Sequence, residues 1–96
     1  MQGARFSKAK LQAYLAEDRY RLDPYVWKGI RELHIDLNDA LYVLRHGAIC
    51  GEPELDTMST QWRFTVEGRT VDGKQLRIGF AFIEIDGVLV LNFLTD

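Results

Sequence analysis

The last third of the chain, from Gln61 to Asp96, alternates apolar and polar side chains in three separate runs. Apolar residues stand at every second position within 62–66, 76–82 and 89–93. A period of two is typical of half-buried β-strands, and an Asp-Gly pair before the second and third runs favours a tight turn. The stretch therefore predicts three antiparallel strands joined by two hairpins.

The pairing of the first two strands follows from placing apolar side chains opposite one another. A slip of one residue would move every apolar side chain to the wrong face, so the register is strongly specified. This predicts Phe64 opposite Phe80 and Val66 opposite Ile78, across a three-residue loop at 71–73. Such loops commonly hold a glycine in the left-handed conformation.

The second hairpin is expected to turn through two residues, Asp86 and Gly87, because Asp-Gly supplies the positive φ angles of a type I′ turn. That loop would place Phe82 opposite Leu91 and Phe80 opposite Phe93. The predicted architecture then depends on one shared apolar face, which should carry Phe64, Phe80 and Phe93 under a helical cover.

The other face of the same sheet is predicted to carry the polar side chains. The register places Glu67 beside Arg77, Thr65 beside Gly79, and Arg63 beside Ala81, with Asn92 next in the row. Small residues between polar neighbours form a shallow trough. It is either an ordinary solvated face, on which the Glu67–Arg77 pair contributes less than ~1 kcal/mol, or a binding surface.

An apolar strip is expected on that face near the second turn. It consists of Ile83, Ile85, Val88 and Val90. Contiguous exposed apolar strips are unusual on monomers. A helix, a partner protein or a second copy of the chain is therefore expected to cover it.

The 96 residues, 47% of them hydrophobic, predict a single folded domain over 1–96. No apolar run is long enough to cross a bilayer, and residues 1–10 lack the apolar centre of a signal peptide. The lone Cys50 fits a reducing cytoplasm and is expected to be a small core residue. His34 and His46 have no metal-ligand spacing, so no metal site is expected.

The net charge of −2 gives no general attraction to nucleic acid. A local basic patch remains open as an interpretation, because four cations crowd the first hairpin. They are Arg63, Arg69, Lys74 and Arg77. The alternative is that these charges only keep the hairpin soluble.

Three helices are predicted before the sheet. The first spans 6–18 with Ser7 as its N-cap, the second opens at Asp23-Pro24, and the third at Asp36. Gly47 is expected to end the third helix in the left-handed conformation. A short edge strand is expected at 48–50 and a loop at 51–59. The predicted fold is thus α+β, with about three N-terminal helices packed on a C-terminal antiparallel sheet of three to four strands.

Three segments give the chain a resemblance to known proteins: 33–37 leading into a short helix, 71–78, and 86–93. Together with the order of elements, they resemble the MqsR-like toxins, a neighbouring uncharacterised family with the same hairpin, and the wider RelE/ParE superfamily. The likeness covers roughly residues 6–93. It implies a helix-on-sheet fold, cleavage of mRNA without a metal or other cofactor, and neutralisation by an antitoxin.

The resemblance implies roles for residues of the polar face. Arg63 and Arg77 would hold phosphate, Glu67 would act as general base beside Arg77, and Asn92 would orient the RNA; Arg69 and Lys74 would add phosphate contacts. Where MqsR-type toxins carry Gln, Tyr and Lys, this chain has Arg63, Gln75 and Thr95 or Asp96. A non-catalytic interaction domain, dimeric through the apolar strip, and an inactive descendant therefore remain alternatives.

Overall fold

The computed structural model describes the backbone of residues 2–58 and 61–96 and the side chains of 8–58 and 61–96. The described chain has three helices, α1 (Gln2–Ala16), α2 (Pro24–Leu33) and α3 (Leu37–His46). Its six strands are β1 (Tyr20–Leu22), β2 (Ala48–Ile49), β3 (Glu54–Asp56), β4 (Gln61–Arg69), β5 (Gln75–Ile83) and β6 (Val88–Thr95). The predicted α+β class is confirmed, but the sheet is larger than the expected three to four strands.

All six strands belong to one sheet, in the order β1-β6-β5-β4-β2, with β3 also paired to β4. β1 is parallel to β6, and every other pair is antiparallel. The expectation of a purely antiparallel sheet is therefore wrong at one edge. The reason is that β1 has only three residues, which is too short to show a period of two.

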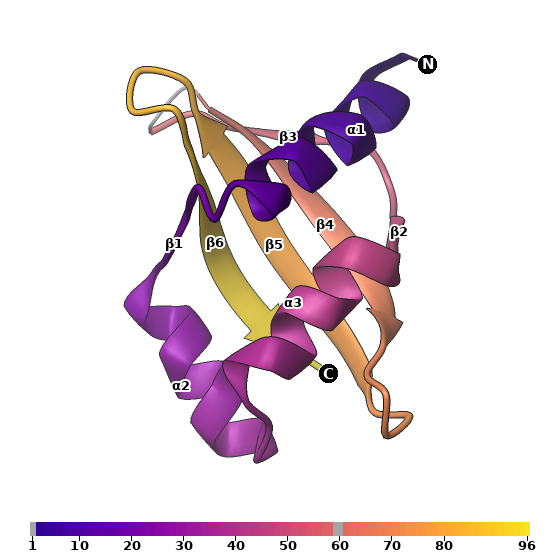
Figure 1. Ribbon diagram of the computed structural model, residues 1–96. Coiled ribbons are helices and arrows are strands. Elements are labelled where there is room, and N and C mark those ends of the chain that lie inside the picture. The colour runs from indigo at the N-terminus through magenta and orange to yellow at the C-terminus, as the bar shows by residue number, and fades with distance from the viewer. Residues whose placement is uncertain (1, 59–60) are drawn as a thin grey trace.

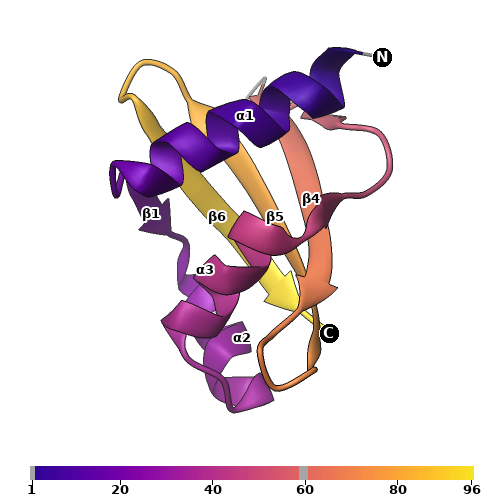
Figure 2. The same cartoon turned by 45° about the vertical axis from the view of Figure 1, so that its right-hand side comes forward.

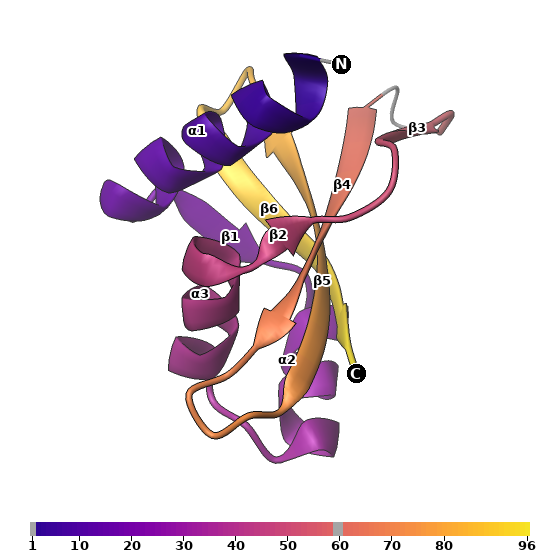
Figure 3. The same ribbon diagram turned by 90° about the vertical axis from the view of Figure 1, so that its right-hand side faces the viewer.

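The helices α1 and α3 cross one face of the sheet, while α2 lies beside β6 (Figures 1 and 2). The side view in Figure 3 shows α1 and α3 on the same side of the sheet. The core forms between these helices and the strands. Leu11, Leu15, Leu44, Phe80 and Leu91 are each at most 1% exposed there. We call the opposite face, which carries the side chains predicted to be polar, the open face.

Two helices begin where the sequence predicts. The Asp23 side chain accepts a hydrogen bond from the Tyr25 backbone N–H, and Pro24 fills the first helical position of α2. Asp36 and Asp39 form a capping box at the start of α3. The prediction of Ser7 as the N-cap of the first helix is wrong, because α1 already begins at Gln2; the side chain of Ser7 lies outside the described ones.

The first hairpin has the predicted register. Phe64 pairs with Phe80, and Val66 pairs with Ile78. Thr70 N–H donates to the carbonyl of Lys74 at 2.9 Å, which leaves the three-residue loop 71–73. Gly73 has φ +88°, the left-handed conformation that the loop requires.

The second hairpin differs from the prediction. Phe82 pairs with Leu89 and Phe80 with Leu91, so the turn contains four residues, 84–87, instead of two. The register then shifts between Gly79 and Phe80, where Asn92 is the extra residue of a β-bulge and Phe93 pairs with Gly79. Phe93 therefore lies on the open face and not with Phe64 and Phe80. The helix-covered layer survives this correction, because Leu94 takes the buried position at 6% exposure.

The connection from α3 to β4 also departs from two expectations. Gly47 has φ −77° and is extended rather than left-handed. A glycine is required because a Cβ there would lie 2.5 Å from the backbone oxygen of Glu67. The edge strand Ala48–Ile49 forms as predicted, but residues 54–56 form β3 on β4 where a loop was expected. The acidic sequence of residues 54–56 shows no strand pattern. These residues form a strand only because they pair with β4.

Candidate functional site

The open face carries the predicted row of cross-strand pairs. Arg63 lies opposite Ala81, Thr65 opposite Gly79, and Glu67 opposite Arg77. The Phe93 ring lies over Gly79, in the middle of the predicted trough, and the surface is hollowed on both sides of this ring. We call the hollow around Arg77 the Arg77 hollow, and the one between α2 and β6 the Asn92 hollow. Arg63 and Phe93 line both hollows, which therefore adjoin, and we call the two together the trough.

Glu67 and Arg77 form an ion pair at the centre of the Arg77 hollow. Nε of Arg77 donates to Oε2 of Glu67 at 3.0 Å, and a terminal guanidinium nitrogen donates to the same oxygen. The hydrogen bond and the charge of Glu67 raise the pKa of Arg77 above its usual value, so this guanidinium stays charged. The arrangement places a carboxylate and a cation side by side on a surface that a ligand can reach.

Arg63 stands at the junction of the two hollows. Its guanidinium donates to Oδ2 of Asp56 at 3.2 Å, and the Arg63 side chain remains 47% exposed. Strand β3 supplies Asp56, so the strand that sequence reasoning missed also holds this arginine in place. Arg63 would have to loosen that contact, or share it, to bind a phosphate.

Cys50 lies in the Arg77 hollow and not in the core as predicted. Its backbone N–H donates to the carbonyl of Thr65 at 2.8 Å, which continues the pairing of β2 and turns the thiol toward Glu67. Burial raises the pKa of the Cys50 thiol, and the negative charge of Glu67 raises that pKa further. The thiol is therefore protonated at neutral pH.

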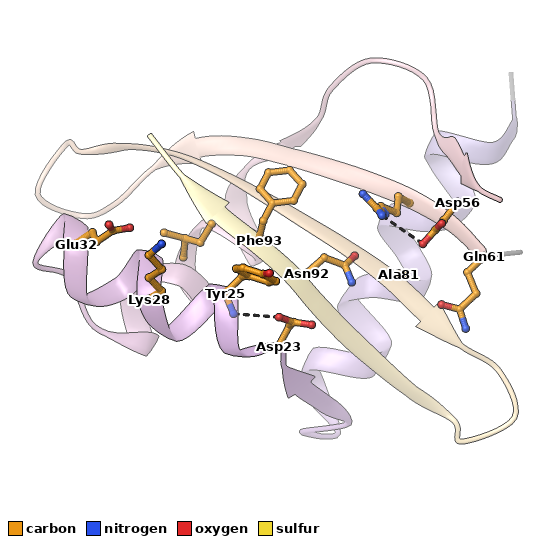
Figure 4. Close-up of a pocket in the computed structure, with 12 residues that line it drawn as sticks. Asp23, Tyr25, Lys28, Glu32, Asp56, Gln61, Ala81, Asn92 and Phe93 are labelled. Carbon is orange, nitrogen blue, oxygen red and sulfur yellow. Dashed lines mark hydrogen bonds and ion pairs between the residues drawn. The ribbon is translucent and has the colours of Figure 1, made fainter. Parts of the chain in front are cut away.

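The Asn92 hollow combines aromatic and polar walls (Figure 4). Tyr25, in the first turn of α2, is 70% exposed, and Phe93 stands across β6 from it. Oδ1 of Asn92 is buried, and no described group donates a hydrogen bond to it. An unsatisfied buried acceptor is costly, so a ligand N–H that displaced the groups covering this oxygen would be stabilised by a hydrogen bond to it.

Two predicted phosphate contacts do not join the trough. Nζ of Lys74 donates to the backbone oxygens of Leu33 at 3.1 Å and His34 at 3.4 Å, so Lys74 caps the end of α2. Arg69 lies on β4 beyond Glu67 and lines neither hollow. The four clustered cations of the first hairpin are thus separated, and only Arg63 and Arg77 face the trough.

Neither histidine reaches the trough. His34 is the exposed C-terminal cap of α2, with φ +54°. The ring of His46 packs on that of Tyr42, with 4.4 Å between the ring centroids. Within residues 2–58 and 61–96, no three His, Cys, Asp or Glu side chains are grouped as metal ligands.

The trough carries more negative than positive side chains. Its cations are Lys28, Arg63 and Arg77. Its carboxylates are Asp23, Glu32, Glu52, Glu54, Asp56 and Glu67. A polyanion would therefore bind here through specific contacts, not through a broad positive field.

Sequence reasoning missed Tyr25, Cys50 and Phe93 as parts of this site. For Tyr25 the sequence does give a signal, because Asp23-Pro24 predicts the start of α2 and so places Tyr25 in the first turn of a helix. The position of Phe93 depends on the bulge at Asn92, for which the sequence carries no pattern.

No protein-family model, curated protein or solved structure matches this chain. Among the described residues, no helix has the length and apolar character needed to cross a membrane.

Proposed function

We propose that the chain is a metal-independent endoribonuclease that binds single-stranded RNA along the trough, as a RelE/MqsR-like toxin would. The supporting observation is the Glu67–Arg77 pair on the open face, with Arg63 beside it. The proposal places the protein in the cytoplasm, where mRNA is present. It also includes an antitoxin-like protein partner, since such an enzyme has to be held inactive in its own cell.

The chemistry needs a base and a cation at one phosphate. Glu67 removes the proton from the ribose 2′-hydroxyl, whose oxygen attacks phosphorus. The P–O5′ bond breaks, a 2′,3′-cyclic phosphate forms, and the departing 5′ oxygen takes a proton from water. Arg77 and Arg63 stabilise the extra negative charge that develops on the phosphoryl oxygens. In this step Arg77 exchanges its bond to Glu67 for bonds to phosphate, which frees the carboxylate to act as the base.

The proposal is tested by incubating the purified protein with end-labelled single-stranded RNA in the presence of a chelator. Glu67→Gln and Arg77→Ala should each lower the cleavage rate about 100-fold or more, because general acid–base catalysis typically contributes 10²–10⁴-fold. Arg69→Ala is the matched control, since Arg69 is on the same strand but outside both hollows. Unchanged cleavage by Glu67→Gln would contradict the assigned role. Absence of cleavage by the wild type, with no growth arrest on expression, would remove the enzymatic claim.

A second candidate function is self-association through the apolar strip. Ile83 pairs with Val88, Val90 pairs with Ala81, and Ile85 is 94% exposed at the tip of the turn. Arg21 and Asp86 form an ion pair next to these residues, so the charges at the edge of the strip are already balanced within one chain. We propose a second copy of the chain as the occupant. The mass of the protein is measured in solution at high protein concentration. A monomeric mass for the wild type, equal to that of Ile85→Lys, would exclude the dimer.

A further inference from the structure

The Asn92 hollow has the features of a subsite for one flat, hydrogen-bonding group. The bulge in β6 turns two consecutive residues, Asn92 and Phe93, toward the same hollow. Regular strand geometry would send them to opposite faces. The irregularity therefore places an amide and an aromatic ring together, in a hollow of about 570 Å³.

The walls of the hollow select a planar ligand. Tyr25 and Phe93 both line the hollow and offer aromatic surfaces, and Figure 4 shows the two rings on opposite sides of β6, the strand that carries Asn92. Aromatic side chains stack on all four nucleobases, because every base has a π-face. Oδ1 of Asn92 is buried and receives no hydrogen bond from the described residues, so it adds an acceptor for an N–H group at the edge of such a ring.

The position of Arg63 connects this hollow to the proposed catalytic pair. Arg63 lines both hollows, and Arg77 lies in the second one. A nucleotide whose base enters the Asn92 hollow would therefore leave its phosphate near Arg63, with the next phosphate free to reach Arg77. A single strand of RNA that crosses the sheet would therefore meet the Asn92 hollow, Arg63 and Arg77 in that order.

We infer that the Asn92 hollow is a nucleobase subsite of the proposed ribonuclease, in which a base stacks against Phe93 and donates an N–H to Oδ1 of Asn92. The inference rests on the proposed function and adds to it a position for the base. An arginine side chain of a protein partner is also planar and rich in N–H donors. The base is favoured because the phosphates of a single strand would also pair with Arg63 and Arg77, for which an arginine-bearing peptide offers no partner.

The test uses the full chain carrying Glu67→Gln, so that RNA is bound but not cut. Two fluorescein-labelled RNA hexamers, oligo(A) and an abasic strand with the same backbone, are titrated by anisotropy. We expect oligo(A) to bind about tenfold or more tightly than the abasic strand, because stacking on an aromatic side chain contributes about 1–3 kcal/mol per base. Asn92→Leu and Phe93→Ala should each remove most of this preference and leave the affinity for the abasic strand unchanged.

Conservative variants separate a binding role from a structural one. Phe93→Tyr keeps the ring and Asn92→Asp keeps an acceptor, so both should retain the preference for oligo(A). Equal binding of the two strands by the parent chain would overturn the subsite while the ribonuclease proposal stands. Failure to bind either strand would overturn both. Tight binding of an oligo-arginine peptide, lost with Asn92→Leu while oligo(A) binding is not, would assign the hollow to a protein partner and overturn the inference.

Discussion

The ring of Phe93 lies directly against the backbone of Gly79 on the neighbouring strand. A Cβ built on Gly79 would come within 2.1 Å of Cε2 of Phe93, so no other residue fits there without moving the ring. This contact exists because the bulge at Asn92 turns Phe93 to the open face. It separates the two hollows and supplies an aromatic wall to each.

Replacing Gly79 with alanine should displace the Phe93 ring. We expect Gly79→Ala to lower the free energy of unfolding by about 1–3 kcal/mol, the usual cost of overpacking, although alanine favours a strand more than glycine does. Urea denaturation measures the change. Thr65→Ala, on the strand next to Gly79, is the control and should cost clearly less. Equal stability of Gly79→Ala and the wild type would show that the ring moves freely.

A second glycine fixes α2 against β6. A Cβ on Gly29 would lie 2.5 Å from the backbone oxygen of Leu94, a group that cannot move without disturbing the strand. In an exposed helix, Gly→Ala stabilises by roughly 1 kcal/mol. Gly29→Ala should instead destabilise the protein by about 1–3 kcal/mol in urea denaturation. Arg31→Ala, at an exposed position of the same helix, should stay within about 0.5 kcal/mol of the wild type.

The thiol of Cys50 should react slowly with iodoacetamide at pH 8, because the thiolate is the nucleophile and the pKa of Cys50 is raised by burial and by Glu67. Glu67→Gln removes the negative charge and should speed the alkylation, whereas Arg77→Ala should slow it. Alkylation in denaturant, where the environment is lost, provides the reference rate. No difference between Glu67→Gln and the wild type would contradict this electrostatic coupling.

The same raised pKa gives stability a defined dependence on pH. The unfolded chain loses the Cys50 proton near the ordinary thiol value of 9.0, while the folded chain keeps it to a higher pH. The contribution is therefore fully present below the unfolded pKa and is lost as the pH rises through the folded pKa. Urea denaturation between pH 8 and 10.5, compared with Cys50→Ser, measures it. A decline of equal size in both chains would assign the effect to other groups.

RNA binding should depend only weakly on salt. Two trough arginines, Arg63 and Arg77, are available for phosphate, and a single strand contributes a slope of about −0.7 per neutralised phosphate. We expect a plot of log affinity against log salt concentration to have a slope of about −1.4. A slope steeper than about −4 would indicate a broad basic surface instead of the trough.

Lys74 should matter for stability and not for RNA. Its ammonium group caps the last carbonyls of α2, at Leu33 and His34. Lys74→Met should cost about 0.5–1 kcal/mol, because it removes a positive charge from a helix C-terminus, and should leave RNA affinity unchanged. Weaker binding by Lys74→Met than by Arg77→Ala would return Lys74 to the role that the sequence suggested.

The sequence by itself determined the elements whose information is local or repeated. Period-two alternation predicted the three long strands and the register between Phe64 and Phe80, since any other register would bury polar side chains. Asp23-Pro24 and the Asp36–Asp39 pair specified two helix starts, because a cap depends only on residues a few positions apart. The Glu67–Arg77 pair followed from the first hairpin without further information.

The tertiary structure alone decided the features that depend on distant partners. The bulge at Asn92 lets Leu94 enter the core and sends Phe93 to the open face, and nothing within 88–95 records which side chain is to be buried. Strands β1 and β3 are three residues each and exist because β6 and β4 offer them unpaired backbone groups. Lys74 lies near Arg77 in sequence, yet its ammonium group donates to the carbonyl of Leu33 at the end of α2 and so does not reach the trough. Packing and hydrogen bonding across long sequence separations decided these positions, and a local pattern cannot encode them.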